Sequence, residues 1–166
     1  YMNETNTTIV WDVWEKYSCS ARLTDYCAKS NIAVGFPVDY RHGWDLSDPA
    51  HCALLDRCDS LFQPKIVFAS PECRNWGNGS KQRDQTIVQQ AKMAETSSLT
   101  WTAADCNRSI QRGGGAVIEQ PWRSSLFDKS PMHAVVPNTR SRNVDQCAHG
   151  ARHPAVKTSL IKKESC

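Results

Sequence analysis

Two side chains that could do chemistry together, Cys73 and Glu119, each stand just past the end of a short apolar run. Residues 66–73 read Ile-Val-Phe-Ala-Ser-Pro-Glu-Cys, and residues 116–121 read Ala-Val-Ile-Glu-Gln-Pro. Open α/β sheets place reactive groups in the crevice beyond the carboxyl ends of their strands. A cysteine and a glutamate there are typical of a nucleophile with a proton-handling carboxyl group. The alternatives are an inert thiol and a structural ion pair of the glutamate with an arginine.

Strands that alternate with helices must position these two residues. The apolar runs predict strands at 9–17, 32–38, 65–70 and 116–119, with weaker candidates at 144–148 and 158–161. Helical spacing and caps predict helices at about 21–30 after Ser20, from Pro49 after Ser47 or Asp48, and within 81–112 before Gly113–Gly115. Such alternation predicts an α/β fold, with a central, mostly parallel sheet flanked by helices.

The composition predicts one soluble globular domain at residues 9–166, after an N-terminal extension at 1–8. Of the 166 residues, 40% are hydrophobic and 22% are charged. The longest apolar stretch, residues 32–38, is far shorter than the roughly 20 residues of a membrane span. The first residues lack the basic start and apolar core of a signal peptide. We therefore favour an intracellular location, although Tyr1 before Met2 leaves a removed targeting segment open.

The net charge of +3 is unevenly distributed. Residues 1–126 carry 13 Lys and Arg against 14 Asp and Glu, whereas residues 127–166 carry 7 against 3. A basic segment suits phosphate groups, so the partners that it indicates are nucleic acid or an acidic protein surface. A solvated tail without a partner is the alternative.

The eight cysteines make up about 5% of the chain, below the roughly 8–10% of disulfide scaffolds. They form no Cys-x-x-Cys pair, which argues against a zinc site and favours reduced thiols. Four Asn-x-Ser/Thr sequons, at Asn3, Asn6, Asn78 and Asn107, support a different hypothesis. Under it the chain is a secreted, glycosylated domain with some cysteines paired.

The predicted strand ends carry a recognisable series of motifs. In chain order they are Tyr17-Ser18-Cys19-Ser20-Ala21, Asp39, Asp45-Leu46, Pro71-Glu72-Cys73, Glu119-Gln120-Pro121 and His149-Gly150-Ala151-Arg152. This order and spacing resemble the cytosine carbon-5 methyltransferases, specifically the short, divergent domains of this type in some eukaryotic retroelements and gene families. The most specific pieces are residues 43–49, 70–73 and 117–126, and the resemblance runs from about Val10 to Ile161.

The resemblance implies a Rossmann-like class I methyltransferase fold that binds S-adenosylmethionine. The cofactor-binding residues that it implies are Tyr17, Cys19, Ala21, Asp39, Asp45, Leu46 and Pro71. The loop after the first strand would hold the methionine part, and Asp39 would accept hydrogen bonds from the ribose hydroxyl groups. Asp45 and Leu46 would flank the adenine.

The same resemblance implies how a cytosine would be methylated. Cys73 would add as a thiolate to carbon 6 of a base flipped from its stack. Glu119 would hydrogen-bond the ring near nitrogen 3, and Arg152 would support the base or a phosphate.

The chain departs from the family pattern at several of these positions. Cys19 and Ala21 stand where the family has glycine, Glu72 replaces a proline, and Gln120 replaces an asparagine. A Cβ atom restricts the approach of a ligand to the loop backbone, and a carboxylate beside a thiol disfavours the thiolate. We also expect no target-recognition region. The favoured hypothesis is therefore a degenerate, non-catalytic domain that serves as a subunit or binding module of a larger assembly. An active cytosine methyltransferase and the secreted domain are the alternatives.

Overall fold

The computed structural model describes residues 10–142, 144–145, 152–153, 156–160 and 164–165, with side chains for residues 10–142. The chain divides into two compact units, each made of two stretches of sequence. The first unit comprises residues 1–69 and 104–117, and the second unit comprises residues 70–103 and 118–166. The single domain expected from the sequence stays a prediction.

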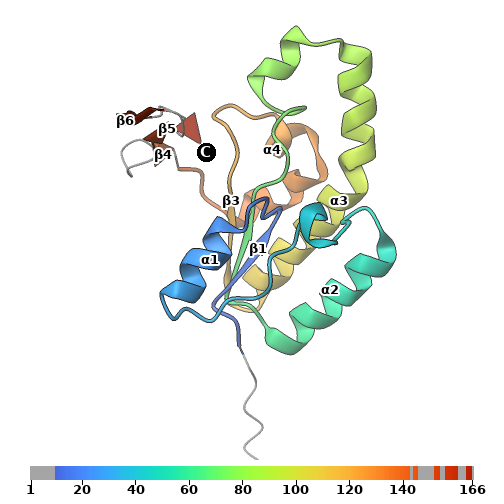
Figure 1. Cartoon of the computed structure of the whole chain (residues 1–166). Coiled ribbons are helices and arrows are strands. Elements are labelled where there is room, and N and C mark those ends of the chain that lie inside the picture. The colour runs from blue at the N-terminus through green and yellow to red at the C-terminus, as the bar shows by residue number, and fades with distance from the viewer. Residues whose placement is uncertain (1–9, 143, 146–151, 154–155, 161–163, 166) are drawn as a thin grey trace, which may run out of the picture. The chain divides into compact units, whose positions relative to one another are not determined.

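A small parallel sheet forms the centre of the first unit (Figure 1). Its strands are β1 (Val13–Lys16), β2 (Ile66–Ala69) and β3 (Gly115–Ile118), in the order β1-β2-β3. Residues 34–38 run parallel to β1 through two single bridges, Val13 to Val34 and Lys16 to Val38. Pro37 has no amide hydrogen, which is why this predicted strand forms no continuous ladder. The prediction of a mixed α/β fold with parallel strands is confirmed at this level.

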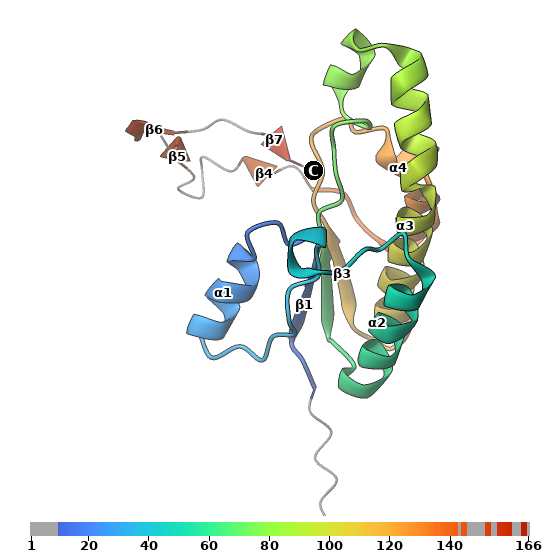
Figure 2. The same ribbon diagram turned by 45° about the vertical axis from the view of Figure 1, so that its right-hand side comes forward.

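Three helices pack on this sheet in two layers. Helix α1 (Arg22–Lys29) covers one face, and α2 (Pro49–Phe62) with the C-terminal end of α3 (Gln85–Gln111) covers the other (Figure 2). The Asp48 carboxylate accepts the Ala50 N–H at 2.8 Å, with Pro49 in the first turn, so the predicted start of α2 is confirmed. Ser20 does not cap α1: the N-cap residue is Ala21, and it makes no side-chain capping bond.

The predicted glycine stop after α3 is also confirmed. Gly113 has a φ of 82°, a left-handed conformation that glycine adopts at little cost. A Cβ atom on Gly114 would collide with the carbonyl oxygen of Lys65. The two glycines therefore let the chain leave the helix and enter β3 close against the start of β2.

Several ionic side chains lie inside the first unit, beside an apolar core that includes Trp14, Val38, Leu55, Val67 and Cys106. Lys16 and Asp105 are both fully buried, and their charged atoms lie 3.5 Å apart. Asp59 is 1% exposed and accepts two hydrogen bonds from the Arg112 guanidinium, at 2.5 and 2.8 Å. A charged residue in a strand such as Lys16 would ordinarily be expected at the surface, so its burial is a tertiary effect.

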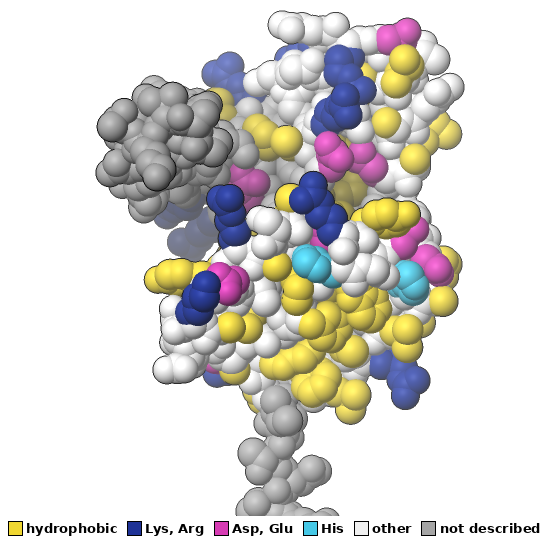
Figure 3. All heavy atoms as spheres, in the orientation of Figure 1, with side chains coloured by type: hydrophobic (Ala, Val, Ile, Leu, Met, Phe, Trp, Pro, Cys, Tyr) yellow, Lys and Arg dark blue, Asp and Glu magenta, His cyan; other side chains and the backbone are white. Residues whose placement is uncertain are grey.

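Aromatic rings form a half-buried layer on the first unit. Trp11 stacks on Phe62 with ring centroids 4.2 Å apart, and Phe36 stacks on Trp44 at 5.3 Å. Figure 3 shows hydrophobic side chains gathered on one face of this unit. Gly35 lies directly under Trp11 and Trp14, and a side chain there would collide with both rings. Trp11 and Trp14 therefore serve packing inside this unit.

The second unit is built around the first part of α3, with the short helices η2 (Asn78–Gln82), α4 (Leu126–Lys129) and η3 (Pro131–Asn138). Its buried apolar residues include Trp76, Val88, Leu99, Leu126, Met132 and Val135. Further along the chain, β4 (Val144–Asp145) pairs with β7 (Glu164–Ser165), and β5 (Arg152–His153) pairs with β6 (Val156–Leu160), all antiparallel. Among the described residues, no helix is long and apolar enough to cross a membrane.

Candidate functional site

The loop between β1 and α1 places three side-chain-bearing residues in the left-handed region. The φ angle is 54° at Tyr17, 48° at Cys19 and 53° at Ala21. Glycine adopts this conformation freely, whereas for other residues it costs about 1–3 kcal/mol each. Cys19 and Ala21 are the two positions at which the family resemblance expects glycine. The loop thus has a backbone conformation that suits glycine, and a Cβ atom is present at each of these positions.

Asp39 lies beside this loop, at the end of the edge segment 34–38. Its Oδ2 accepts the Cys19 N–H and its Oδ1 accepts the Arg41 N–H, both at 2.9 Å. The second bond caps the short helix η1 (Tyr40–His42), a common structural use of aspartate. The structure therefore brings Asp39 to the loop, as expected, but each carboxylate oxygen already holds a backbone amide.

The Glu15 carboxylate accepts hydrogen bonds from the first turn of α1. Its side chain is 5% exposed, and its Oε2 accepts both the Thr24 N–H at 2.9 Å and the Thr24 hydroxyl at 2.6 Å. A helix N-terminus attracts anions because its first amides lack partners inside the helix. Glu15 supplies that anion here. This role was not predictable from the sequence, because a glutamate in a strand has no local signal that points to the helix that follows.

Asp45 and Leu46 follow η1 in a closed turn. The Trp44 N–H donates to the Asp39 carbonyl at 3.1 Å, which joins this segment to the end of the 34–38 strand. The Asp45 N–H donates to His51 Nδ1 at 2.9 Å, and its Oδ1 accepts both the N–H and the hydroxyl of Ser47. These Ser47 bonds lower the pKa of Asp45. Leu46 is buried, so it offers little surface to an adenine ring.

The two turns that carry Cys73 and Glu119 are joined in the second unit by Gln120. Its side chain is fully buried, and its Nε2 donates to the Pro71 carbonyl at 2.6 Å. Its Oε1 accepts the Ser124 hydroxyl at 3.0 Å. Gln120, which replaces the asparagine of the family pattern, therefore joins the Pro-Glu-Cys turn to the Glu-Gln-Pro turn.

Cys73 and Glu119 are both half-buried within this joined pair of turns. The Cys73 carbonyl accepts the N–H groups of Trp76 and Gly77, at 3.1 and 2.8 Å, which closes the turn after the cysteine. Pro71, expected at the cofactor, is buried beneath Gln120. The side chain of Arg152 lies outside the described residues, so its expected support of a base stays a prediction.

Trp76 is held from two directions in the second unit. Its Nε1 donates to Glu95 Oε2 at 2.5 Å, and Asn75 donates to Glu95 Oε1 at 2.6 Å. Its carbonyl accepts both the N–H and the hydroxyl of Ser125, at 2.8 and 2.9 Å. Lys92 Nζ lies 4.8 Å from the centre of its ring. These contacts hold the Trp76 ring in one position, and no motif in the sequence indicated this.

Six cysteines have described side chains, and all six carry free thiols: Cys19, Cys27, Cys52, Cys58, Cys73 and Cys106. Burial raises the pKa of Cys27 and of Cys52, and it raises the pKa of Cys106 to about 12. These three thiols are thus unsuited to nucleophilic catalysis. Within the described part of the chain, no cluster of three or more His, Cys, Asp or Glu side chains could hold a metal ion.

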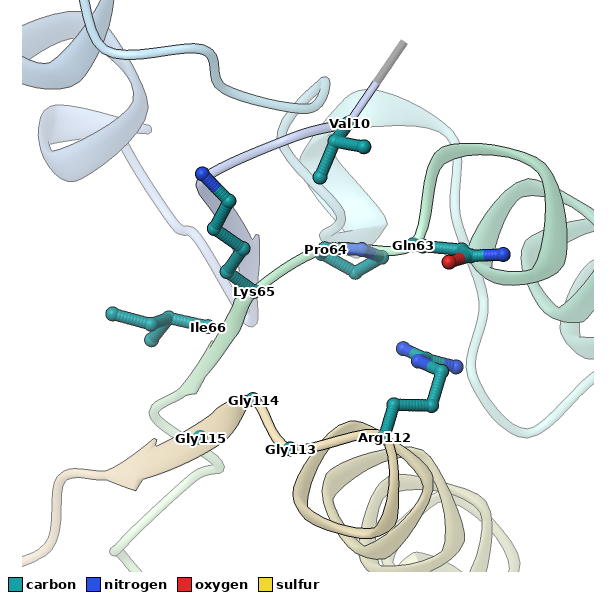
Figure 4. A pocket seen from close by; sticks show the side chains of 9 residues that line it. All are labelled: Val10, Gln63, Pro64, Lys65, Ile66, Arg112, Gly113, Gly114 and Gly115. Atoms are coloured by element: carbon teal, nitrogen blue, oxygen red, sulfur yellow. The ribbon is translucent and has the colours of Figure 1, made fainter. Parts of the chain in front are cut away.

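A hollow of about 570 Å³ opens at the N-terminal ends of the strands in the first unit, the end of the sheet away from the β1–α1 loop (Figure 4). It is lined by residues at or just before the N-terminal ends of the strands, including Val10, Lys65 and Gly113–Gly115. Ligands of open α/β sheets bind beyond the carboxyl ends of the strands, so this is not the expected cofactor site. Its charged groups are also paired, Lys65 with Asp12 at 2.7 Å and Arg112 with Asp59.

No protein-family model, curated protein or solved structure matches the chain. The methyltransferase resemblance therefore rests on the sequence motifs alone.

Proposed function

We propose that the chain is a non-catalytic, methyltransferase-like α/β domain that serves as a subunit or binding module of a larger assembly. One observation carries this proposal: in the first unit, the amides and carboxylates that a cofactor would bind are already hydrogen-bonded to one another. Glu15 occupies the start of α1, and Asp39 accepts the amides of Cys19 and Arg41.

A cofactor at this loop would compete with hydrogen bonds that the protein makes within itself. A Rossmann-type site offers a ligand the amides of a helix N-terminus and an acidic side chain after the second strand. Here the Thr24 amide and both Asp39 oxygens already have partners inside the protein. A ligand would have to replace these bonds and also fit against the Cβ atoms of Cys19 and Ala21. We therefore expect S-adenosylmethionine to gain too little to bind.

A role in an assembly is supported by the surfaces of the two units. Half-buried rings and exposed apolar side chains, such as Leu54 and Leu61, lie on the first unit. Larger apolar patches of this kind commonly mark interaction sites. The described residues of the second unit up to residue 142 carry 8 Lys and Arg against 5 Asp and Glu, which suits an acidic or nucleic-acid partner.

An active cytosine methyltransferase is the second candidate, and the Gln120 link favours it. A buried hydrogen bond from Gln120 to Pro71 holds the turns of Cys73 and Glu119 together. If the chain is active, Cys73 is the nucleophile and Glu119 the group that holds the base. Methyl transfer to a cytosine oligonucleotide that Cys73→Ser abolishes would establish this candidate.

Calorimetric titration of the full chain with S-adenosylmethionine tests the proposal. We expect no saturable heat at millimolar cofactor, and no thermal shift. Ligand at 100 times its Kd would add about 2.7 kcal/mol of stability, which a melting curve detects easily. Binding that Asp39→Ala abolishes would contradict the proposal. A matched Asp48→Ala variant, which loses only the cap of α2, controls for general loss of stability.

A further inference from the structure

The second unit contains a hollow of about 250 Å³ that the methyltransferase resemblance leaves unused. Four of its lining residues come from α3, namely Gln89, Lys92, Met93 and Thr96. Trp76 and Lys129 line it from the loop before α3 and from α4. Three separate segments of the second unit thus meet at one concave surface.

The lining of this hollow carries positive charge only. Lys92 and Lys129 are its charged residues, and no carboxylate lines it. Within the described residues, neither lysine has a carboxylate at ion-pair distance. The nearby acid, Glu95, is bound by the indole of Trp76 and the amide of Asn75. Two ammonium groups beside one concave surface favour an anionic occupant.

The remaining lining groups indicate what kind of anion fits. Gln89 and Thr96 add an amide and a hydroxyl group, which can donate hydrogen bonds to phosphate oxygens. Met93, whose side chain is 68% exposed, adds adaptable apolar surface for an organic group attached to the phosphate. The Trp76 ring is fixed by its hydrogen bond to Glu95. The surface that Lys92 contacts is therefore already formed before a ligand binds.

We propose that this hollow binds a phosphate group of a nucleotide, with Lys92 and Lys129 as the contacting cations. The inference rests on the proposed binding-module function and names its partner class. It does not depend on the cofactor question, because every lining residue belongs to the second unit. Binding of S-adenosylmethionine to the first unit would therefore leave this proposal standing. Absence of phosphate binding to the second unit would leave the proposal of a non-catalytic domain standing.

The test measures fluorescence anisotropy of a labelled single-stranded oligonucleotide titrated with the full chain at several salt concentrations. Lys92→Gln and Lys129→Gln should each weaken binding, by up to about fivefold for an exposed charge pair. Each should also reduce the slope of log affinity against log salt by about 0.7. Lys92→Arg should retain binding. Lys81→Gln removes the same charge from an exposed site outside the hollow and should change little.

Competition identifies the source of the phosphate. Displacement by a mononucleotide at similar concentration points to a free nucleotide, and displacement only by oligonucleotides points to nucleic acid; both support the proposal. In either case inorganic phosphate should shift the Trp76 indole N–H resonance, assigned with Trp76→Phe. Equal weakening by Lys81→Gln, equal displacement by a poly-glutamate or phosphoserine peptide, or absence of binding would overturn it.

Discussion

The two units differ in whether the charged side chains at their candidate sites have partners inside the protein. In the first unit, Glu15, Asp39 and the buried Lys16–Asp105 pair are bonded within the unit itself. In the second unit, Lys92 and Lys129 line a concave surface without a described carboxylate partner. Groups that are satisfied internally stabilise a fold, whereas groups left open are available to a ligand. This difference underlies our two proposals, namely that the strand-end loops of the first unit are structural and that the hollow of the second unit binds a phosphate group.

The largest expected effect comes from breaking the internal pairing of the first unit. Arg112→Ala leaves Asp59, which is 1% exposed, without its bidentate partner. Losing one member of a buried ion pair costs about 3–5 kcal/mol, and we expect the lower end because Arg108 also reaches Asp59 at 3.5 Å. Chemical denaturation measures the loss. Lys29→Ala, which breaks the exposed pair with Asp25, is the control and should cost under about 0.5 kcal/mol.

The second expected effect concerns the link inside the second unit. Gln120→Ala removes the buried bond to the Pro71 carbonyl and leaves that oxygen unsatisfied. The free energy of unfolding should fall by about 1–3 kcal/mol, measured by denaturant unfolding. Gln111, which is exposed at the end of α3, provides the control, and Gln111→Ala should be nearly neutral. Equal losses in the two variants would show that Gln120 does not hold the turns together.

Stability should depend on pH through the buried Lys16. Burial lowers the pKa of this lysine from 10.5 to about 8, although Asp105 partly opposes the shift. Between pH 8 and 10.5 the unfolded chain binds more protons than the folded chain, so this lysine makes stability rise with pH, by at most about 1.4 kcal/mol per unit. The raised pKa values of Cys27, Cys52 and Cys106 act in the opposite direction above pH 9. The rise should therefore show between about pH 8 and 9.

The variant Lys16→Met checks this assignment. It should remove the rise between pH 8 and 9, measured by denaturant unfolding at each pH. Methionine removes the titrating ammonium group, and Arg108 remains 3.2 Å from the Asp105 carboxylate as its ionic partner. A rise of the same size in Lys16→Met would assign the pH dependence to another group.

Much of the fold was predictable because its signals are local. Asp48-Pro49 marks the start of α2, Gly113-Gly114 ends α3, and the apolar runs at 66–69 and 115–118 form strands. The site was less predictable because its contacts are tertiary. Asp39 was expected from the motif order to lie beside the loop after β1, and it does. It gave no sign that Glu15 would serve α1.

The smallest expected effect tests the strain in the β1–α1 loop. Ala21→Gly should raise the free energy of unfolding by about 1 kcal/mol, because Ala21 has a φ of 53°. The matched change Ala28→Gly, inside α1, should lower it by about 1 kcal/mol. Destabilisation by both changes would mean that the left-handed conformation at residue 21 carries no strain.

The central claim is that the first unit satisfies its own strand-end groups and leaves no place for the cofactor. Two-dimensional amide NMR of the full chain, titrated with S-adenosylmethionine, tests it most directly at the amides of Cys19, Thr24 and Arg41. These three amides donate to Asp39 or Glu15. A cofactor that displaced either carboxylate must therefore shift the amide resonances. We predict no shift at millimolar cofactor. Saturable shifts at all three amides would contradict the account.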